Sequence, residues 1–343
     1  MKVLAVTNMY PTNASPAHGT FVESQVESLR ALVDIEVLHI DRALLGKSAY
    51  FSVRRQVGRA IGATNPDIVH VMNGGALAFF TATAVRHAPF VISFCGSDLL
   101  GDPQVSWKRR GVGGATVLAS KVAALRADAI IAKSKQLAAK VPGAVPLRKI
   151  HVIPNGVDFS RFRPLDRSEC QSRLGWNPDE FQVLFTGNPD SETKRFNDAL
   201  GAVECARARG IPARLQLMRG VRHEDVPVWL NAADVLLLCS VHEGSPNIVK
   251  ESLACECPVV STDVGDVAER MEGIAGCYLC DRTAESLADG LGAVYRRRAR
   301  LRCRSQIASI STEAIARRVE SVYRGIAEFS KSAERLRTQS RSA

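Results

Sequence analysis

The stretch that decides the fold is VLLLCSVHEGSPNIVKESLACECPVVSTDVGD, from Val235 to Asp266. It opens with an apolar run, Val235 to Cys239, which is as short and uncharged as a buried parallel strand. The pair Ser245-Pro246 then predicts a helix start, because Ser is a preferred N-cap residue and Pro at the first helical position gives up no hydrogen bond. We therefore expect a strand, a loop and a helix that runs from about Pro246 to Cys255.

Two carboxylates flank this predicted helix start. Glu243 lies in the loop and Glu251 in the second helical turn, with seven residues between them. A helix that begins at the carboxyl end of a parallel sheet stabilises phosphate with its free amides. A carboxylate beside that phosphate needs hydrogen-bond donors, and the vicinal hydroxyls of a sugar are suitable ones. The layout favours a phosphate held between two sugars, and the alternative is an ordinary βαβ unit whose glutamates are solvated.

The segment HEGSPNIVKESLACECPVVSTDVGD resembles the signature of the retaining glycosyltransferases of family 4. In that signature E-x7-E is followed by a helix of small residues, a Pro-Val-Val strand and a glycine turn. The similarity is clearest from Thr186 to Asp266 and weaker from Met1 onward. It implies that Glu251 binds the nucleotide ribose and that Glu243 contacts the donor sugar. It also implies that a diphosphate is held by the backbone amides of the segment Gly244, Ser245, Pro246, Asn247 and Ile248.

The first half of the chain alternates apolar runs with helical patterns, which implies a parallel sheet with right-handed crossovers. We expect strands at residues 2–7, 35–40, 68–72, 90–94, 129–132 and 150–153. No G-x-G-x-x-G follows the first strand, which argues against a nicotinamide or flavin enzyme. A long loop, rich in turn formers, precedes the helix expected from Phe21 to Leu32. Gly19 in this loop resembles the family's glycine that lets the loop approach the donor phosphates and the acceptor. Alternatively, it only starts the helix.

The segment Cys95-Gly96-Ser97-Asp98 follows the strand at residues 90–94 and so lies at the carboxyl end of the sheet. Asp98 either orients an acceptor hydroxyl or the donor sugar, or caps the next turn. Basic residues Lys108, Arg109 and Arg110 follow beside Trp107. With the flexible glycines from Gly111 to Gly114, they indicate an element that faces the acceptor or a membrane.

The segment IPNGVD, from Ile153 to Asp158, resembles the interdomain hinge of the family, and its Pro, Asn and Gly are turn formers. We therefore predict an acceptor-side domain over residues 1–157 and a nucleotide-sugar donor domain over residues 158–311. A final basic helix, from residue 312 to about 335, is expected to pack back on the first domain, as in related folds. The resemblance implies an α/β protein of the GT-B arrangement, with two Rossmann-like, doubly wound domains facing each other across a cleft.

The second half predicts strands at residues 181–186, 214–218, 235–239 and 258–261, and another near 275–279. After the first of them, family members carry an Arg directly after the glycine at Gly187 and a Lys later in the loop, and both neutralise the departing diphosphate. Lys194 fits the lysine, although a solvated surface lysine is the alternative. Asn188 stands where the Arg is expected. Either Arg195 or Arg219 takes its place, or Lys194 and the helix amides stabilise the leaving group by themselves.

The net charge of +10 over 343 residues favours anionic partners such as nucleotides, phospholipid surfaces or nucleic acid. Six arginines between Arg296 and Arg304 contribute to this excess, and we expect them to form a solvated helix face or a membrane-surface patch. Aromatic residues make up only 6%, and no RRM, KH or zinc-finger pattern accompanies the charge, which argues against nucleic acid. No apolar stretch approaches the ~20 residues that span a bilayer, so any membrane contact is expected to be peripheral.

Nine cysteines, an odd number without a secretory signal, indicate a reducing cytosol. The protein is therefore expected in the cytoplasm, with the inner face of the membrane as its site of peripheral contact. The pair Cys277-x-x-Cys280 lacks a second ligand pair at zinc spacing, and no D-x-D motif is present. We expect no cofactor and no metal.

The predicted function is transfer of a glycosyl group from a nucleotide diphosphate sugar to a hydroxyl of a carbohydrate or lipid-linked acceptor, with retention of configuration. Cell-surface polysaccharide or glycolipid synthesis is the expected setting. The predicted catalytic residues are Glu243, Lys194 and Asp98. Two alternatives remain: a nucleotide-sugar 2-epimerase of the same fold, and a non-catalytic nucleotide-sugar binder, because Asn188 replaces an expected charge.

Overall fold

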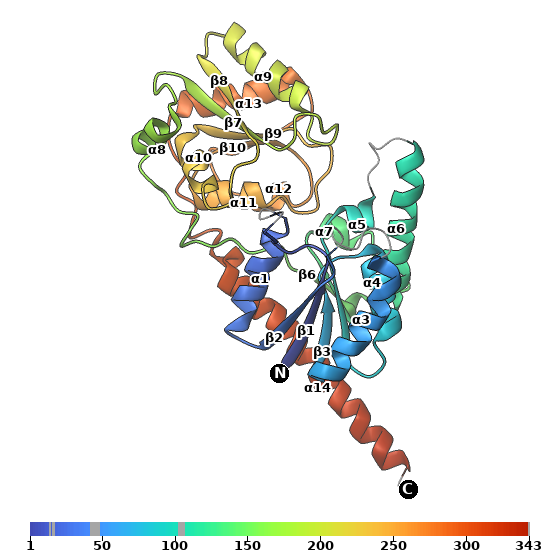
Figure 1. Cartoon of the computed structure of the whole chain (residues 1–343). Coiled ribbons are helices and arrows are strands. Elements are labelled where there is room, and N and C mark those ends of the chain that lie inside the picture. Colours follow the sequence, from blue (N-terminus) through green and yellow to red (C-terminus); the bar gives the residue numbers. More distant parts are fainter. Residues whose placement is uncertain (14, 16–17, 42–48, 102–106, 342–343) are drawn as a thin grey trace. The chain divides into compact units, whose positions relative to one another are not determined.

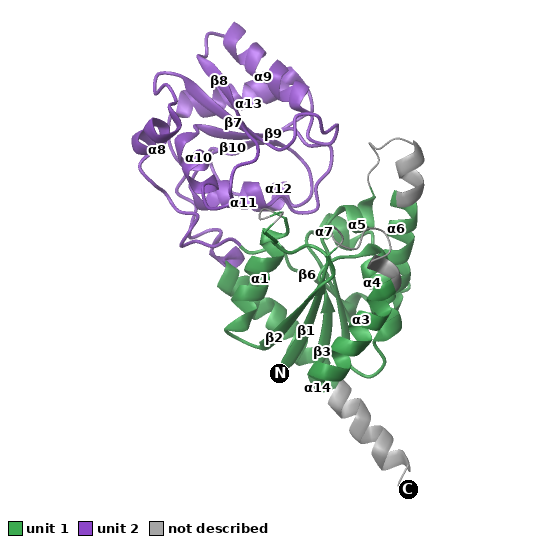
Figure 2. Ribbon diagram, viewed as in Figure 1, with its two compact units in different colours: residues 1–156, 312–343 green, residues 157–311 purple. Residues whose placement is uncertain are grey.

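The computed structural model describes residues 1–341 apart from residues 14, 16–17, 42–48 and 102–106. For residues 49–51, 107–112 and 330–341 it describes the backbone alone. The chain forms two compact units (Figure 2). Unit 1 contains Met1–Gly156 and Thr312–Ala343, and unit 2 contains Val157–Ser311.

Unit 1 is built on a parallel sheet whose six strands have the order β2-β1-β3-β4-β5-β6 (Figure 1). The inner strands are buried on both faces, as parallel strands covered by helices must be. The strands are β1 (Lys2–Thr7), β2 (Asp34–His39), β3 (Ile68–Val71), β4 (Phe90–Phe94), β5 (Ala129–Ala132) and β6 (Ile150–Val152).

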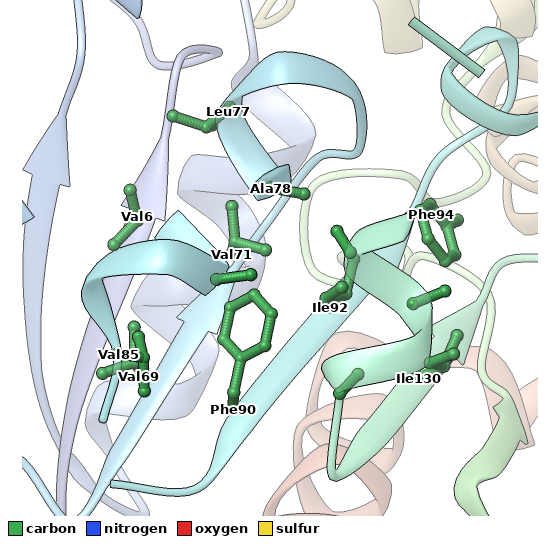
Figure 3. Packing of buried hydrophobic residues seen from close by; sticks show 14 of the residues in the cluster. Val6, Val69, Val71, Leu77, Ala78, Val85, Phe90, Ile92, Phe94 and Ile130 are labelled. Carbon is green, nitrogen blue, oxygen red and sulfur yellow. The ribbon is translucent and has the colours of Figure 1, made fainter. Parts of the chain in front are cut away.

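Helices cover both faces of this sheet. One face packs against α1 (Thr20–Arg30) and α14 (Thr312–Arg341). The other face packs against α3 (Ala49–Thr64), α4 (Gly75–Ala84) and α6 (Trp107–Arg126), and Figure 3 shows its interdigitated core, where Phe90, Ile92 and Val71 meet Leu77 and Ala78. Two short helices, α5 (Ser97–Leu100) and α7 (Lys135–Ala138), follow β4 and β5.

The final helix is joined to the sheet of unit 1 by a buried polar contact. The Tyr323 hydroxyl lies 2.5 Å from Nδ1 of His70, and Nε2 of His70 lies 2.8 Å from Oγ of Ser93. Burial lowers the pKa of His70 to about 3, so its ring is neutral. The helix therefore packs on the first unit with a specific side-chain pairing as well as with apolar surface.

Unit 2 repeats the architecture with a parallel sheet of five strands in the order β11-β10-β9-β7-β8. The strands are β7 (Phe181–Thr186), β8 (Ala213–Met218), β9 (Val235–Leu238), β10 (Val259–Thr262) and β11 (Tyr278–Cys280). One face packs against α9 (Phe196–Ala208) and α13 (Ala284–Arg297), and the other packs against α10 (Val226–Ala232), α11 (Asn247–Ala254) and α12 (Val267–Met271). A further helix, α8 (Arg167–Leu174), contacts α10.

The predicted α/β class is confirmed, because the strands form close to where the apolar runs predict them and all pair in parallel. The expectation of a flexible glycine element at residues 111–114 is wrong, since these residues lie inside α6. The helix continues through them because its later turns bury Ala123 and Ala124 in the core beside α4. The side chains of Trp107, Lys108, Arg109 and Arg110 lie outside the described residues.

The expectation of a solvated arginine face holds only in part. Arg296, Arg297, Arg298 and Arg302 are exposed. Arg300 instead donates to the carbonyl oxygens of Ala233 and Cys255, and Arg304 donates to those of Ala254 and Phe162. These two guanidinium groups are part of the fold, because three of the four carbonyls lie at the ends of α10 and α11, which the helices themselves leave open.

Candidate functional site

Two of the predicted catalytic side chains meet at the carboxyl end of the sheet of unit 2. The ammonium of Lys194 lies 2.5 Å from Oε1 of Glu243, and the hydroxyl of Ser240 donates to the same oxygen at 2.8 Å. The loops that carry the pair, after β7 and after β9, are also joined by a backbone bond from Val241 to Thr193. Lys194 is 29% and Glu243 18% exposed, so the pair is reachable from solvent.

The start of α11 differs from its prediction by one residue. The helix begins at Asn247, and extended Pro246 occupies the N-cap position with no side-chain cap. Ser245 is therefore not the cap. Its hydroxyl donates to Oδ2 of Asp266 at 3.0 Å and accepts from Nζ of Lys250 at 2.9 Å. Pro246 makes no side-chain cap bond, and the positive end of the helix dipole favours an anion at this end of α11.

A buried ionic cluster lies beneath this helix start. Lys250 is completely buried and Asp266 is 2% exposed, and Ser245 bridges them. Arg270 approaches the same carboxylate, with Nε 3.2 Å from Oδ2. Burial raises the pKa of Asp266, and the charges of Lys250 and Arg270 oppose that rise. Sequence reasoning missed Lys250, although its place on the same helix face as Leu253 was a readable signal of burial.

Glu251 has a partner that sequence reasoning did not name. Its Oε1 lies 3.2 Å from Nε2 of His223, a residue in the loop between β8 and α10. The Glu251 side chain is 12% exposed, so part of the carboxylate remains accessible. The only sequence signal for His223 is its place in a loop at the carboxyl end of a strand, where open α/β sheets bind ligands.

Two loop positions at this end of the sheet require glycine for steric reasons. Gly265 has a φ of +62°, and a Cβ there would lie 2.9 Å from the carbonyl oxygen of Gly244. Gly187 has a φ of +120°, and its Cβ would lie 3.2 Å from Cγ of Lys194. Each position combines a positive φ with too little space for a Cβ, and glycine is the residue that suits both. These glycines therefore let the loops pack closely around the Lys194 and Glu243 pair.

The other predicted donor side chains of unit 2 have environments of their own. Asn188 is exposed, and its side-chain oxygen accepts from the backbone of Asp190. Arg195 makes two bonds to Asp198, at 2.9 and 3.0 Å. Arg219 is exposed just beyond the end of β8. Of the two arginines considered as replacements for the missing charge, Arg195 is therefore already paired with a carboxylate. Ile248 is half-buried and packs against the core under α11.

The two predicted residues of unit 1 support their own loops. Gly19 has a φ of +77°, and a Cβ there would lie 2.3 Å from the carbonyl carbon of Met9, so the loop after β1 folds onto itself at a point that only glycine permits.

Asp98 is 5% exposed and accepts backbone N–H bonds from Gly74, Cys95 and Gly96. Burial raises its pKa, and these amides oppose the rise. The carboxylate oxygens therefore shape the loop after β4 and join it to Gly74, while α5 itself has no side-chain cap bond.

The described part of the chain lacks two features. No group of three or more His, Cys, Asp or Glu side chains in that part of the chain is arranged to hold a metal ion. Among the same residues, no helix combines the length and the apolar character needed to cross a bilayer.

Comparison with known proteins places the chain. Residues 14–161 match the family described as Glycosyltransferase Family 4, and residues 172–297 match the family described as Glycosyl transferases group 1. The Bacillus subtilis protein TuaC, assigned to teichuronic acid biosynthesis as a glycosyltransferase, is 26% identical, with 85% of this chain and 88% of TuaC covered.

Solved structures share the fold at low sequence identity. Sucrose-phosphate synthase from Thermosynechococcus elongatus superposes with a TM-score of 0.75 at 16% identity, covering 95% of this chain and 99% of that one. Anabaena HepE, solved in complex with UDP, superposes with a TM-score of 0.63 at 17% identity, covering 97% of this chain and all of that one. Since both halves match and the two Rossmann-like units form the GT-B fold, the chain belongs to the family 4, group 1 glycosyltransferases.

Proposed function

We propose that this glycosyltransferase moves a sugar from a nucleotide diphosphate sugar to an acceptor hydroxyl with retention of configuration. The observation that carries the proposal is the Lys194 and Glu243 pair in the loops at the carboxyl end of the sheet, with the start of α11 four residues after Glu243 and Glu251 on that helix. This arrangement combines a cation and helix amides for a diphosphate with two carboxylates for sugar hydroxyls. The UDP bound to HepE supports a nucleotide-linked donor.

In this proposal Lys194 exchanges partners when the donor binds. The ammonium leaves Glu243 and contacts the diphosphate, which frees the carboxylate to accept a hydrogen bond from a hydroxyl of the donor sugar. Glu251 accepts from the ribose hydroxyls. The amides at the start of α11 and Lys194 then stabilise the charge that grows on the leaving phosphate oxygen.

Retention follows a front-face path. The bond between the anomeric carbon and the phosphate oxygen breaks while the acceptor oxygen attacks from the same face, and the departing phosphate oxygen takes the acceptor proton. No protein nucleophile is required, so the residues of the site contribute by positioning and by electrostatic stabilisation.

The proposed acceptor is a carbohydrate or lipid-linked hydroxyl in cell-surface polysaccharide or glycolipid synthesis, as the role assigned to TuaC supports. A cytoplasmic location with peripheral contact to an anionic inner membrane face is part of this proposal. The exposed Arg296, Arg297, Arg298 and Arg302 supply suitable charge. Sedimentation with anionic vesicles tests the contact, and absence from the vesicle pellet at low salt would exclude it.

A panel of UDP-, GDP-, ADP- and dTDP-sugars tests the donor class. The matching donor should raise the unfolding temperature by mass action, and incubation with an acceptor extract should release its nucleotide. Donor incubated alone separates the alternatives: a changed sugar configuration indicates a 2-epimerase, and binding without nucleotide release under any condition indicates a non-catalytic binder. If no nucleotide sugar stabilises the protein, the proposal fails.

Activity is expected to survive chelation. Lys194 and the start of α11 supply positive charge where metal-dependent enzymes place a cation. Turnover measured with excess EDTA should equal that without it. A reaction that stops in EDTA and recovers on addition of manganese would show that a metal takes part.

Glu251→Ala is expected to weaken donor binding while the fold stays intact. The ribose hydroxyls would lose a charged acceptor worth about 1.5–3 kcal/mol, which corresponds to about 10- to 150-fold in Kd. Isothermal titration calorimetry with the matching donor measures the change. Glu204→Ala is the control, because Glu204 is an exposed helix glutamate of the same unit and its loss should leave the Kd unchanged. Equal affinities for the Glu251→Ala protein and the unmodified protein would remove Glu251 from the site.

A further inference from the structure

His223 connects the proposed ribose carboxylate to the segment by which the chain enters unit 2. Its Nε2 lies 3.2 Å from Oε1 of Glu251, and its Nδ1 lies 3.0 Å from Nη1 of Arg161. Arg161 belongs to the start of unit 2, which begins at Val157. A histidine between an arginine and a carboxylate can bind both groups only if its two ring nitrogens take different roles.

The Arg161 contact fixes which nitrogen carries the proton. An arginine side chain has only N–H donors, so Nδ1 of His223 must accept this bond. The ring hydrogen of the neutral imidazole therefore lies on Nε2, from which it is donated to Glu251. The hydrogen bond made by one ring nitrogen of a histidine often sets the tautomer of the ring. Here the bond at Nδ1 places the proton on Nε2, which points toward Glu251.

The ring of His223 is also held in place by packing. It lies 5.4 Å, between ring centroids, from the buried ring of Phe162. The segment that carries Phe162 is fixed at both ends of its turn, because Asp158 accepts from the backbone of Arg161 and Arg304 donates to the carbonyl oxygens of Phe159 and Phe162. The imidazole therefore has a defined position before any ligand binds.

We propose that His223 is a positioning residue for the nucleotide donor. By holding Oε1 of Glu251, it leaves Oε2 oriented to accept hydrogen bonds from the 2′- and 3′-hydroxyls of a ribonucleoside diphosphate. This inference rests on the proposed function, and it adds a selectivity for the ribose diol that a freely rotating carboxylate would not have.

Two variants separate this role from simple packing. His223→Phe keeps an aromatic ring against Phe162 but removes both hydrogen bonds. His223→Gln keeps an amide N–H near the position of Nε2. The probe is whichever of UDP, GDP and ADP most stabilises the unmodified protein, together with its 2′-deoxy analogue.

Calorimetry should show about tenfold weaker binding of the nucleotide to His223→Phe, the lower end of the effect of one hydrogen bond to a charged group, and near-normal binding to His223→Gln. The preference for the ribonucleotide over its 2′-deoxy analogue should shrink in His223→Phe. KM for the donor should rise while kcat at saturating donor stays within about twofold, and the unfolding temperature without nucleotide should be unchanged.

The nitrogen-15 shifts of the His223 ring should show a proton on Nε2 and none on Nδ1. A proton on Nδ1, or equal nucleotide affinity for His223→Phe and the unmodified protein, would overturn the inference. So would a His223→Gln protein as weak as His223→Phe. If the unmodified protein binds no nucleotide at all, it is the proposed function that fails, and the nitrogen-15 measurement still reports on the hydrogen-bond arrangement.

Discussion

Replacing Lys194 with alanine is expected to lower turnover by at least about 10²-fold while the protein stays folded. When a diphosphate leaves, negative charge grows on the oxygen that had bonded the sugar, and only groups that interact more strongly with that charge than with the ground state raise the rate. Lys194 is suited to this because it is paired with Glu243 at the site, partly exposed and free to change partners. The scale is that of removing one preorganised donor from a developing anion.

The loss of turnover in Lys194→Ala depends on which other side chains carry positive charge near the diphosphate. Asn188 can donate a hydrogen bond but not a charge-assisted one, and charge-assisted bonds are roughly twice as strong. Arg195 is already bonded to Asp198. Lys194 should therefore carry more of the stabilisation than it would beside an arginine at position 188.

Steady-state turnover of four variants checks the assignment. Asn188→Arg should partly rescue Lys194→Ala, because it restores a charge in the same loop. Arg195→Ala and Arg219→Ala are the matched controls and should each retain most of their turnover. If Lys194→Ala keeps near-normal turnover while either arginine variant loses it, the missing charge comes from that arginine and the role of Lys194 is wrong.

The fold could be predicted because its determinants are local. Buried parallel strands are continuous apolar runs, so β1, β4, β5 and β7 were readable from composition and length alone. Helix α9 carries an equally readable signal, with buried residues at 199, 202, 203 and 206. Helix α6 was hidden by its glycines, whose cost in a helix is outweighed by the core contacts of later turns.

The partners within the site could not be predicted, because they depend on contacts between distant residues. Ser245 has the chemistry of an N-cap, yet its hydroxyl is used by Asp266, 21 residues away. His223 reaches Glu251 across 28 residues. Arg300 and Arg304 look the same in sequence as the exposed arginines beside them, and only the packed helix ends decide that they donate inward. Residue type indicates which chemistry is available, while tertiary packing decides where it is used.

Unit 2 contains two lysines in contrasting environments. Lys194 and Lys250 are the only lysines between residues 157 and 311, although arginines are frequent there. One is partly exposed and paired at the site, and the other is completely buried beneath it. They therefore form a natural matched pair for comparing an accessible cation with a buried one.

Lys250→Met is expected to destabilise unit 2 by about 3 kcal/mol or more, the scale seen when a buried charge loses its compensating charge. Methionine fills a similar volume, so the loss is electrostatic: among the described residues, Asp266 would keep only Arg270 as its counter-charge. Urea unfolding followed by tryptophan fluorescence measures this, because Trp176 and Trp229 meet edge to face in unit 2 and report its unfolding. Lys194→Met, which breaks the more exposed pair, should cost under about 1 kcal/mol.

The counter-charge explanation has its own test in Asp266→Asn combined with Lys250→Met. The double variant leaves no uncompensated carboxylate and should recover most of the lost stability.

The pH dependence of stability tests the same explanation independently. Burial already raises the pKa of Asp266, and removing Lys250 removes the main opposing charge, so the folded-state pKa should rise further above the unfolded value. A folded state that holds the proton more tightly gains stability as the pH falls, so the deficit of Lys250→Met should be greatest at neutral pH and shrink on acidification through that raised pKa. A deficit that stays constant with pH, or that Asp266→Asn does not relieve, would mean that Lys250 stabilises the helix start by packing and by its bond to Ser245, and not as the counter-charge of Asp266.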